Sequence, residues 1–316
     1  MNRLHYETDR SLHQALDKRE RSVSSSERTI RLIGWVAGRH QFTAPHYPKG
    51  RLMHIDFTGR TALVTGSTLG IGLATAEAFA RAGARTVLNG RDEARLVAAA
   101  DGIRARVPGA DMVTVAADVS TAEGAQALLE AVPEVDVLVN NTGIFASTPV
   151  LEIEDEEWRR FFEVNVLSGV RLARQYMPGM MGRGFGRIVF VSSETAIDTP
   201  LDMVHYGMTK TALLAVAGGL AKAAAGTGVT VNSVLPGPTH TEGIEEYITA
   251  LIPEAETFDA AQREFIARFR PTSLIQRLIR PSEVADLILF TSSDRASATT
   301  GAALKVEGGT LTSLTP

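Results

Sequence analysis

The stretch TALVTGSTLGIGLATAEAFA, residues 61–80, reads as a β-strand, a glycine-rich loop and a helix. Its glycines Gly66, Gly70 and Gly72 are spaced GxxxGxG. Glycine allows a sharp turn and lets backbone N–H groups approach a pyrophosphate, which the positive end of the next helix attracts. An ordinary turn between a strand and a helix could carry the same glycines, but the flanking elements favour a dinucleotide site. The expected contacts are Gly66, Ser67, Thr68, Leu69, Gly70, Ile71 and Gly72.

From Arg60 onward, short β-branched runs alternate with longer Ala- and Leu-rich segments, such as the helical stretches at 73–83 and 155–178. This alternation predicts a single doubly wound α/β (Rossmann) domain, with a parallel sheet covered by helices on both faces. Right-handed crossovers then bring the carboxyl ends of the strands to one edge, where ligands bind. The seven predicted strands are 61–65, 85–89, 112–116, 135–140, 187–192, 229–235 and 303–306.

The composition is that of an ordinary soluble protein. Of 316 residues, 44% are hydrophobic and 22% charged, and the net charge of −4 gives no reason to expect nucleic acid or an anionic membrane as a partner. The absence of cysteine excludes disulfides and thiolate chemistry. The seven histidines form no HxxxH pair, and no apolar run reaches the ~18 residues of a membrane span. We therefore expect a cytoplasmic protein without a metal site.

The first 52 residues differ from the rest of the chain. They carry ten Arg and Lys against five Asp and Glu, and a polar SVSSSE stretch at 22–27. This composition predicts a poorly ordered extension, and its acidic residues argue against a transit peptide. Met53 opens MHIDFTGRTALVTGS, a natural beginning for a domain, so residues 1–52 could instead be a misassigned start. We expect the Rossmann domain to occupy residues 53–316.

The end of the second predicted strand bears on the choice of cofactor. An NAD site usually places an acid there for the ribose 2′-hydroxyl, but this chain reads TVLNGRD, with Gly90 at that position and Arg91 next. A guanidinium matches a 2′-phosphate in shape and charge, which favours NADP(H) over NAD(H). Alternatively, Arg91 is a solvated charge paired with Asp92, although Asp92 is also a candidate helix cap.

The third predicted strand is followed by AADVS. Asp118 could accept a hydrogen bond from an adenine amino group, with Val119 beside it in the cofactor site. A turn or a helix cap would explain Asp118 equally well.

The stretch HYGMTK, residues 205–210, holds one of five tyrosines and one of five lysines. Four residues apart on a helix, Tyr206 and Lys210 would lie on one face. An adjacent ammonium favours the ionised form of a phenol, whose ordinary pKa is ~10. A phenol acidified in this way could exchange a proton with an alcohol near neutral pH. A YxxxK pair alone is common on protein surfaces, but Ser193 lies at a strand end thirteen residues before Tyr206.

Seven features therefore occur in order along the chain, and with them the chain resembles the short-chain dehydrogenase/reductase family over about residues 55–310. They are TGSTLGIG (65–72), NNTG (140–143), Asn165, Ser193, YGMTK (206–210), PGPT (236–239) and VEGG (306–309).

The resemblance implies a catalytic set. Tyr206 would be the general acid in reduction and the base in oxidation, and Lys210 would bind the nicotinamide ribose and acidify the phenol. Ser193 would hold the substrate oxygen, and Asn165 would keep a water in a proton relay from Lys210. The alternatives are a strand-end hydroxyl bonded to the backbone for Ser193 and a buried structural amide for Asn165.

The resemblance also implies further cofactor contacts. The family pattern NNAG is NNTG here, so Thr142 departs from it. Glu307 replaces a more usual aspartate, which we interpret as structural. The implied contacts, for the adenosine ribose and then for the nicotinamide, are Asn140, Asn141 and Gly143, followed by Pro236, Gly237 and Thr239.

Substrate choice is expected to lie in a lid at about 240–277, although this segment could instead be simple helical packing or an oligomer contact.

The predicted function is NAD(P)(H)-dependent interconversion of a carbonyl and a secondary alcohol, by default like the 3-oxoacyl-carrier-protein reductases. The alternative is a catalytically silent protein that senses dinucleotides. By resemblance we expect a homodimer or homotetramer whose dimer face includes 155–178 and 206–225.

Overall fold

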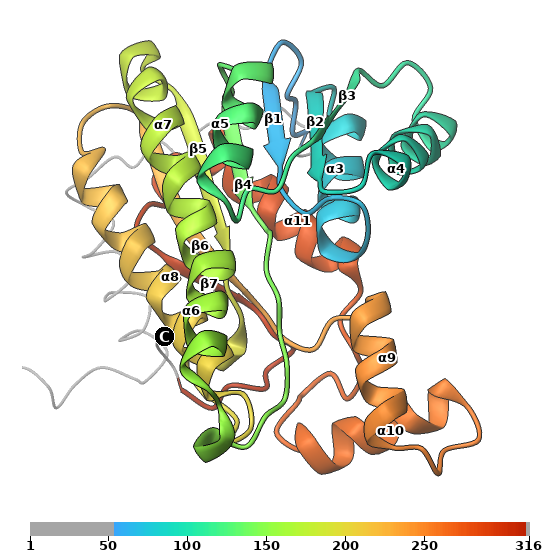
Figure 1. The fold of residues 1–316 in the computed structure, drawn as a ribbon. Helices are drawn as coiled ribbons and strands as arrows, with labels where there is room; N and C mark the ends of the chain where they lie inside the picture. Colours follow the sequence, from blue (N-terminus) through green and yellow to red (C-terminus); the bar gives the residue numbers. More distant parts are fainter. Residues whose placement is uncertain (1–53, 314–316) are drawn as a thin grey trace, which may run out of the picture. The chain divides into compact units, whose positions relative to one another are not determined.

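A single sheet of seven parallel strands, in the order β3-β2-β1-β4-β5-β6-β7, forms the centre of the computed structural model (Figure 1). The model describes residues 54–313, so the predicted extension at 1–52 lies outside the described residues. The predicted seven-stranded parallel sheet is confirmed, with strand ends that differ by at most two residues from those predicted. The strands are β1 (Thr61–Val64), β2 (Arg85–Gly90), β3 (Met112–Ala116), β4 (Val137–Asn140), β5 (Gly186–Val191), β6 (Val229–Pro236) and β7 (Ala303–Val306).

Helices cover both faces of the sheet, which explains why the strands read as nearly continuous apolar runs. Side chains alternate between the faces: Leu63 belongs to one apolar core, whereas Ala62 and Val64 belong to the other. The first core is completed by α5 (Ala122–Ala131), α7 (Ser168–Arg183) and α8 (Val204–Ala223), and the second by α3 (Gly70–Arg81), α4 (Glu93–Arg106) and α11 (Pro281–Ser292).

The predicted helix at 155–178 is not one regular helix. It consists of α6 (Asp155–Phe162), a π-helical turn at Glu163–Leu167 and then α7. The apolar pattern runs through the turn without a break, so the irregularity cannot be seen in the sequence. Single π turns within helices often mark functional sites, and this one contains Asn165.

The predicted lid segment folds into two helices, α9 (Glu242–Leu251) and α10 (Phe258–Phe269). Thr241 and Thr257 cap them by accepting hydrogen bonds from the backbone N–H groups of Ile244 and Ala260. Figure 1 shows both helices beyond the carboxyl ends of the strands. They enclose an apolar cluster of their own, formed by Ile248, Ile252, Ala261, Phe265, Ile266 and Leu278.

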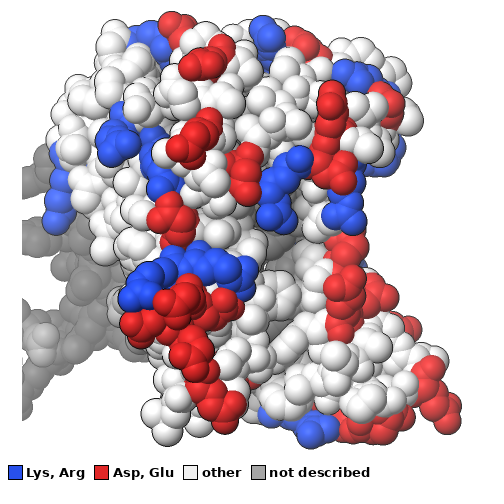
Figure 2. All heavy atoms as spheres, in the orientation of Figure 1, with Lys and Arg blue, Asp and Glu red and all other residues white. Residues whose placement is uncertain are grey.

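Acidic and basic side chains are interspersed over the face of the described residues drawn in Figure 2. Many are paired along one helix, as in α6, where Arg159 bonds Asp155 and Glu156. No helix between residues 54 and 313 is long and apolar enough to cross a membrane. Within the same residues, no three His, Asp or Glu side chains gather as they would to hold a metal ion.

Candidate active site

The glycine loop and the ends of β2, β3 and β4 surround one hollow at the carboxyl edge of the sheet. It brings together most of the predicted cofactor contacts. These are Gly66, Thr68, Leu69, Gly70, Ile71, Gly72, Arg91, Asp118, Val119, Asn141 and Gly143.

The glycine loop has the geometry that a pyrophosphate needs. Gly66 and Gly70 have φ of 60° and 57°, a region that favours glycine. A Cβ added to Gly72 would lie 2.3 Å from the carbonyl oxygen of Gly66, so a side chain at 72 does not fit. Helix α3 begins after Leu69 without a side-chain cap and without an acid in its first turn, so the backbone N–H groups of that turn are not capped by Leu69. The loop therefore fits the phosphates of a dinucleotide.

The side chains of Ser67 and Asn140, both predicted cofactor contacts, do not line this hollow. Ser67 is buried, and its hydroxyl accepts a hydrogen bond from the backbone N–H of Asn89, which ties β1 to β2. Asn140 is buried beneath α7, where a Cβ on Gly169 would lie 3.2 Å from its Cγ. Asn140 is the last residue of β4, and neighbouring side chains of a strand point to opposite faces of the sheet, so a linear motif does not show which of them face the cofactor.

Arg91 is exposed at the rim of the hollow and forms no ion pair with any residue between 54 and 313. Asp92 does not pair with it; instead Asp92 caps α4 by accepting a hydrogen bond from the backbone N–H of Arg95 at 3.0 Å. The guanidinium of Arg91 is thus free to meet an anion. Asp118 both lines the hollow and holds a turn, because its carboxylate accepts bonds from the backbone and side chain of Ser120 at 3.0 and 2.6 Å.

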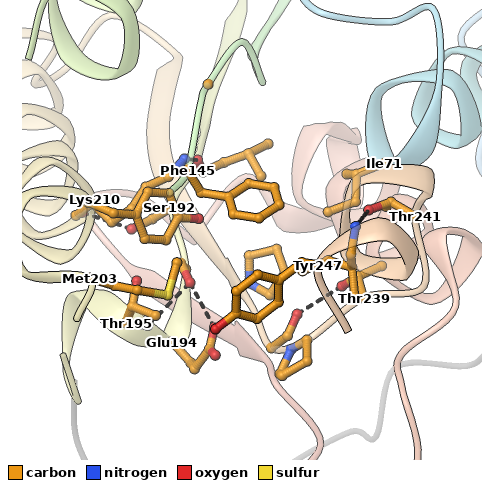
Figure 3. A pocket seen from close by; sticks show the side chains of 18 of the residues that line it. Ile71, Phe145, Ser192, Glu194, Thr195, Met203, Lys210, Thr239, Thr241 and Tyr247 are labelled. Carbon is orange, nitrogen blue, oxygen red and sulfur yellow. Dashed lines mark hydrogen bonds between the residues drawn. The ribbon is translucent and has the colours of Figure 1, made fainter. Parts of the chain in front are cut away.

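A second hollow adjoins the first, and residues such as Ile71, Asn141 and Gly143 line both. Its lining includes the predicted residues Ser193, Tyr206, Lys210, Pro236, Gly237 and Thr239. Figure 3 shows Lys210, Ser192 and Met203 on one side of this pocket and Ile71, Thr239 and Thr241 on the other.

Two contacts fix the end of β5 and the residue that follows it relative to Lys210 of α8. The hydroxyl of Ser192 donates to the backbone carbonyl of Lys210 at 2.8 Å. The ammonium of Lys210 donates to the carbonyl oxygen of Val191 at 2.9 Å and lies 5.4 Å from the centre of the Tyr206 ring. The predicted proximity of Tyr206 and Lys210 is therefore present, and Ser193 follows directly from the anchored strand end.

The electrostatics of this pair differ from the sequence-based expectation. Burial, followed by the nearby charge of Glu194, raises the pKa of Tyr206, while a hydrogen bond with Ser193 acts to lower it. Burial also lowers the pKa of Lys210 from 10.5 to about 8. In the protein alone, burial therefore outweighs any acidification of the phenol by the ammonium, because burial opposes charge on both groups.

Asn165 is buried at the π-helical turn, and its amide makes three hydrogen bonds. Its oxygen accepts from the backbone N–H of Ile144 at 2.8 Å, and its nitrogen donates to the carbonyl of Ile144 at 2.9 Å and to Thr209 at 3.0 Å. These bonds hold the loop after β4 against α8. A Cβ on Gly143 would lie 3.4 Å from the Lys210 nitrogen and 3.5 Å from the Asn165 oxygen, so these three residues meet at one point.

Two charged residues in the second hollow were not predicted. Glu194 is 5% exposed, and its carboxylate accepts a hydrogen bond from the Ser193 hydroxyl at 2.7 Å. Arg270, the residue that follows α10, donates to the same carboxylate from Nε and Nη2, both at 3.4 Å. The only sequence signal was an acid directly after Ser193 at a strand end; nothing in the sequence pointed to Arg270.

Aromatic rings from two separate segments narrow the same hollow. Phe145, from the loop after β4, lies 6.3 Å from the Tyr206 ring and 6.2 Å from the Tyr247 ring of α9. Figure 3 shows Phe145 and Tyr247 lying across the pocket. Tyr247 packs in turn on Phe265 of α10, at 6.3 Å. Residues of the predicted lid therefore form one wall of the pocket that contains Tyr206.

Comparison with known proteins gives matches over most of the chain. Residues 60–250 match the family model described as short chain dehydrogenase. The uncharacterized oxidoreductase YvaG of Bacillus subtilis is 46% identical over 263 residues, which cover 83% of this chain and 100% of YvaG. The 3-oxoacyl-acyl-carrier-protein reductase FabG of Escherichia coli is 32% identical over 255 residues, with coverage of 81% and 98%. The structure of L-sorbose reductase from Gluconobacter frateurii, complexed with NADPH and L-sorbose, is 34% identical with a TM-score of 0.79, and the match covers 83% of this chain and 100% of that one.

Proposed function

This chain belongs to the short-chain dehydrogenase/reductase family of oxidoreductases, and from this premise we propose that it reduces a ketone to a secondary alcohol with NADPH. The observation that carries the proposal is the meeting of Ser193, Tyr206 and Lys210 in one hollow that shares its lining with the glycine-loop hollow. A dinucleotide held in the first hollow, at the glycine loop, would extend toward the second. A carbonyl placed beside Tyr206 would then meet both a proton donor and the reducing end of the cofactor.

NADPH, when bound, supplies the hydride. The protein residues supply the proton and the orientation: Tyr206 protonates the developing alcohol oxygen, and the Ser193 hydroxyl, once released from Glu194, donates a hydrogen bond to the same oxygen. Burial raises the pKa of Tyr206, so the phenol keeps its proton at neutral pH, as a general acid must. Lys210 and Asn165 position the loop and the helix around this proton donor.

The preference for NADPH is supported by the surroundings of Arg91. Its guanidinium lines the first hollow without a partner between residues 54 and 313, and Gly90 leaves no acid at the end of β2. A 2′-phosphate would give this charge a partner, whereas a ribose hydroxyl would not. The related L-sorbose reductase was solved with NADPH, which agrees with this choice.

The test is a panel of ketones followed by loss of NADPH absorbance, with Tyr206→Phe as the diagnostic variant. We expect turnover to fall by about 100- to 10,000-fold, because a general acid contributes that much, while NADPH still binds. Tyr176→Phe is the matched control: it removes a phenol hydroxyl that donates to Val132 in the core, away from both hollows.

Wild-type turnover in Tyr206→Phe would reject the assignment of Tyr206. Binding of NADPH by the wild-type protein without reduction of any carbonyl would instead favour the dinucleotide-sensing alternative.

The oligomeric state and the location belong to the same proposal. We expect a cytoplasmic homodimer or homotetramer, with the outer surfaces of α6, α7 and α8 at the dimer face, as the family resemblance implies. Light scattering of the purified full chain gives its mass in solution, and a monomer at micromolar concentration would contradict this expectation.

A further inference from the structure

The pocket beside Tyr206 contains a buried ion pair that proton transfer does not require. Glu194 begins the short 3-10 turn after β5, and Arg270 directly follows α10. The side chains are 7% and 17% exposed. Taking two charges out of water costs free energy that their attraction often fails to recover, so such a pair is weak evidence of a stabilising role. Both residues line the pocket, where their polar atoms can meet a ligand.

The pair retains unused hydrogen-bonding capacity. The two bonds from Arg270 to Glu194 are long, at 3.4 Å, and a third N–H group donates to the carbonyl of Phe269. An arginine has further N–H donors beyond these, and each oxygen of a carboxylate can accept more than one bond. A substrate hydroxyl, which both donates and accepts, could therefore bind Glu194 and Arg270 together.

The position of Glu194 indicates where on the substrate that hydroxyl would lie. The Glu194 carboxylate is bonded to the Ser193 hydroxyl at 2.7 Å, and Ser193 is the proposed holder of the carbonyl oxygen. A group that reaches Glu194 is thus close to the reacting carbon. The remaining wall is apolar and aromatic, with Phe145, Met203, Tyr247 and Phe265, which suits the C–H faces of a small molecule.

Two other substrate classes fit this pocket less well. An unbranched apolar acyl chain would cover the ion pair without offering it hydrogen bonds, which costs free energy. A substrate carboxylate would compete with Glu194 for Arg270 and leave two like charges close together. A neutral substrate rich in hydroxyl groups avoids both penalties.

We propose that this enzyme's substrate is a small polyhydroxy ketone, with hydroxyl groups near its carbonyl bound by the paired Glu194 and Arg270. The proposal rests on the ketone reduction proposed above and adds the substrate class to it. Glu194 and Arg270 are then residues that determine specificity.

The first test compares erythrulose with butanone, which share a carbon skeleton and differ in their hydroxyl groups, using the full chain and NADPH. We expect kcat/KM for erythrulose to exceed that for butanone by at least about 100-fold, because a site built to bind hydroxyls discriminates against ketones that lack them. Acetoacetyl-coenzyme A and acetoacetate represent the acyl and carboxylate classes. A higher kcat/KM for butanone or for either acetoacetyl compound would overturn the proposal while leaving ketone reduction intact.

Variants of Glu194 and Arg270 test whether these two residues determine specificity. In Glu194→Gln and in Arg270→Met, the ratio of kcat/KM for erythrulose to that for butanone should fall by about 10- to 100-fold. Glu246→Gln and Arg263→Met remove the same charges from exposed positions of α9 and α10, and there the ratio should stay at its wild-type value. Since a single change leaves one charge buried without its partner, the double variant Glu194→Leu/Arg270→Met provides a second measurement if the single variants fold poorly. An unchanged ratio in the double variant would overturn the proposal.

A binding measurement separates this proposal from the one on which it rests. With NADP⁺ bound, erythrulose should raise the melting temperature of the wild-type protein, and butanone at the same concentration should not. Equal effects of the two ketones would count against the hydroxyl site. If NADPH binds but no ketone is reduced, the proposed function itself fails, and the substrate assignment falls with it.

Discussion

The ammonium nitrogen of Lys210 lies 5.4 Å from the centre of the Tyr206 ring and donates its hydrogen bond to the carbonyl oxygen of Val191. The two residues share one face of α8, as their spacing requires, and both side chains extend into the same hollow. Yet burial shifts their pKa values in opposite directions, upward for Tyr206 and downward for Lys210. The protein therefore keeps the phenol protonated at neutral pH, and it brings the pKa of the ammonium down to about 8.

The buried charge of Lys210 should make stability depend on pH in alkaline solution. Below pH about 8 the lysine is charged in both states, and the folded state bears the cost of burial. As pH rises from about 8 to 10.5, the folded state loses its proton first, so this cost disappears and stability recovers. The interval corresponds to about 3 kcal/mol, at about 1.4 kcal/mol per pKa unit.

We therefore expect the free energy of unfolding of the wild type, relative to Lys210→Met, to rise by up to about 3 kcal/mol across this interval. Urea unfolding of both proteins without cofactor measures the difference at each pH. Since the two proteins differ only at position 210, a constant difference would show that Lys210 is not a buried charge.

Glu194→Gln should lower the apparent pKa for alcohol oxidation. The carboxylate of Glu194 raises the pKa of Tyr206, after the larger effect of burial, and oxidation needs the phenolate as base. Removing that charge lets the phenol ionise at lower pH. The rising limb of kcat/KM against pH, measured with NADP⁺ and the alcohol product, should therefore move to lower pH. Glu246→Gln, an exposed change on α9, should leave it in place; an upward shift in Glu194→Gln would contradict the assignment.

Arg91→Ala should weaken NADPH binding without weakening NADH binding. A charge-assisted hydrogen bond to a phosphate is worth about 1.5–3 kcal/mol, which is about 10- to 100-fold in Kd. Titration of the protein with each cofactor gives the two affinities. Arg95→Ala is the control, because its side chain is exposed on the first turn of α4 and does not line the hollow. Unchanged NADPH affinity in Arg91→Ala would remove the basis for preferring NADPH.

Gly72→Ala should destabilise the protein and impair cofactor binding. The new Cβ would lie 2.3 Å from the backbone oxygen of Gly66, so the loop must move. Overpacking of this kind costs about 1–3 kcal/mol, and the displaced loop should bind NADPH more weakly. In the control Gly102→Ala, the Cβ meets only the end of the Arg106 side chain at 3.5 Å, and stability should rise by about 0.4–1 kcal/mol. Thermal unfolding and NADPH titration measure stability and cofactor affinity in Gly72→Ala and Gly102→Ala. Equal stability and equal affinity in the two variants would contradict the steric argument.

Local patterns in the sequence determined the fold and much of the site. A strand followed by closely spaced glycines and a helix requires the turn seen at Gly66–Gly72, and the alternation of strands and helices requires a parallel sheet covered on both faces. Tyr206 and Lys210 could be placed together because a helix repeats every ~3.6 residues. Asp92 could be identified as a helix cap because capping also depends only on residues that are close in sequence.

Tertiary structure decided what lies opposite these residues. Glu194 and Arg270 are 76 positions apart, and they meet only because the end of α10 lies beside the turn that follows β5. The π-helical turn at Asn165 fits the backbone of Ile144, a contact across 21 positions that no local period encodes. The pKa values of Tyr206 and Lys210 likewise follow from burial by distant segments rather than from their spacing. Periodicity fixes neighbours along one element, whereas contacts and solvent exclusion between elements depend on how the whole chain packs.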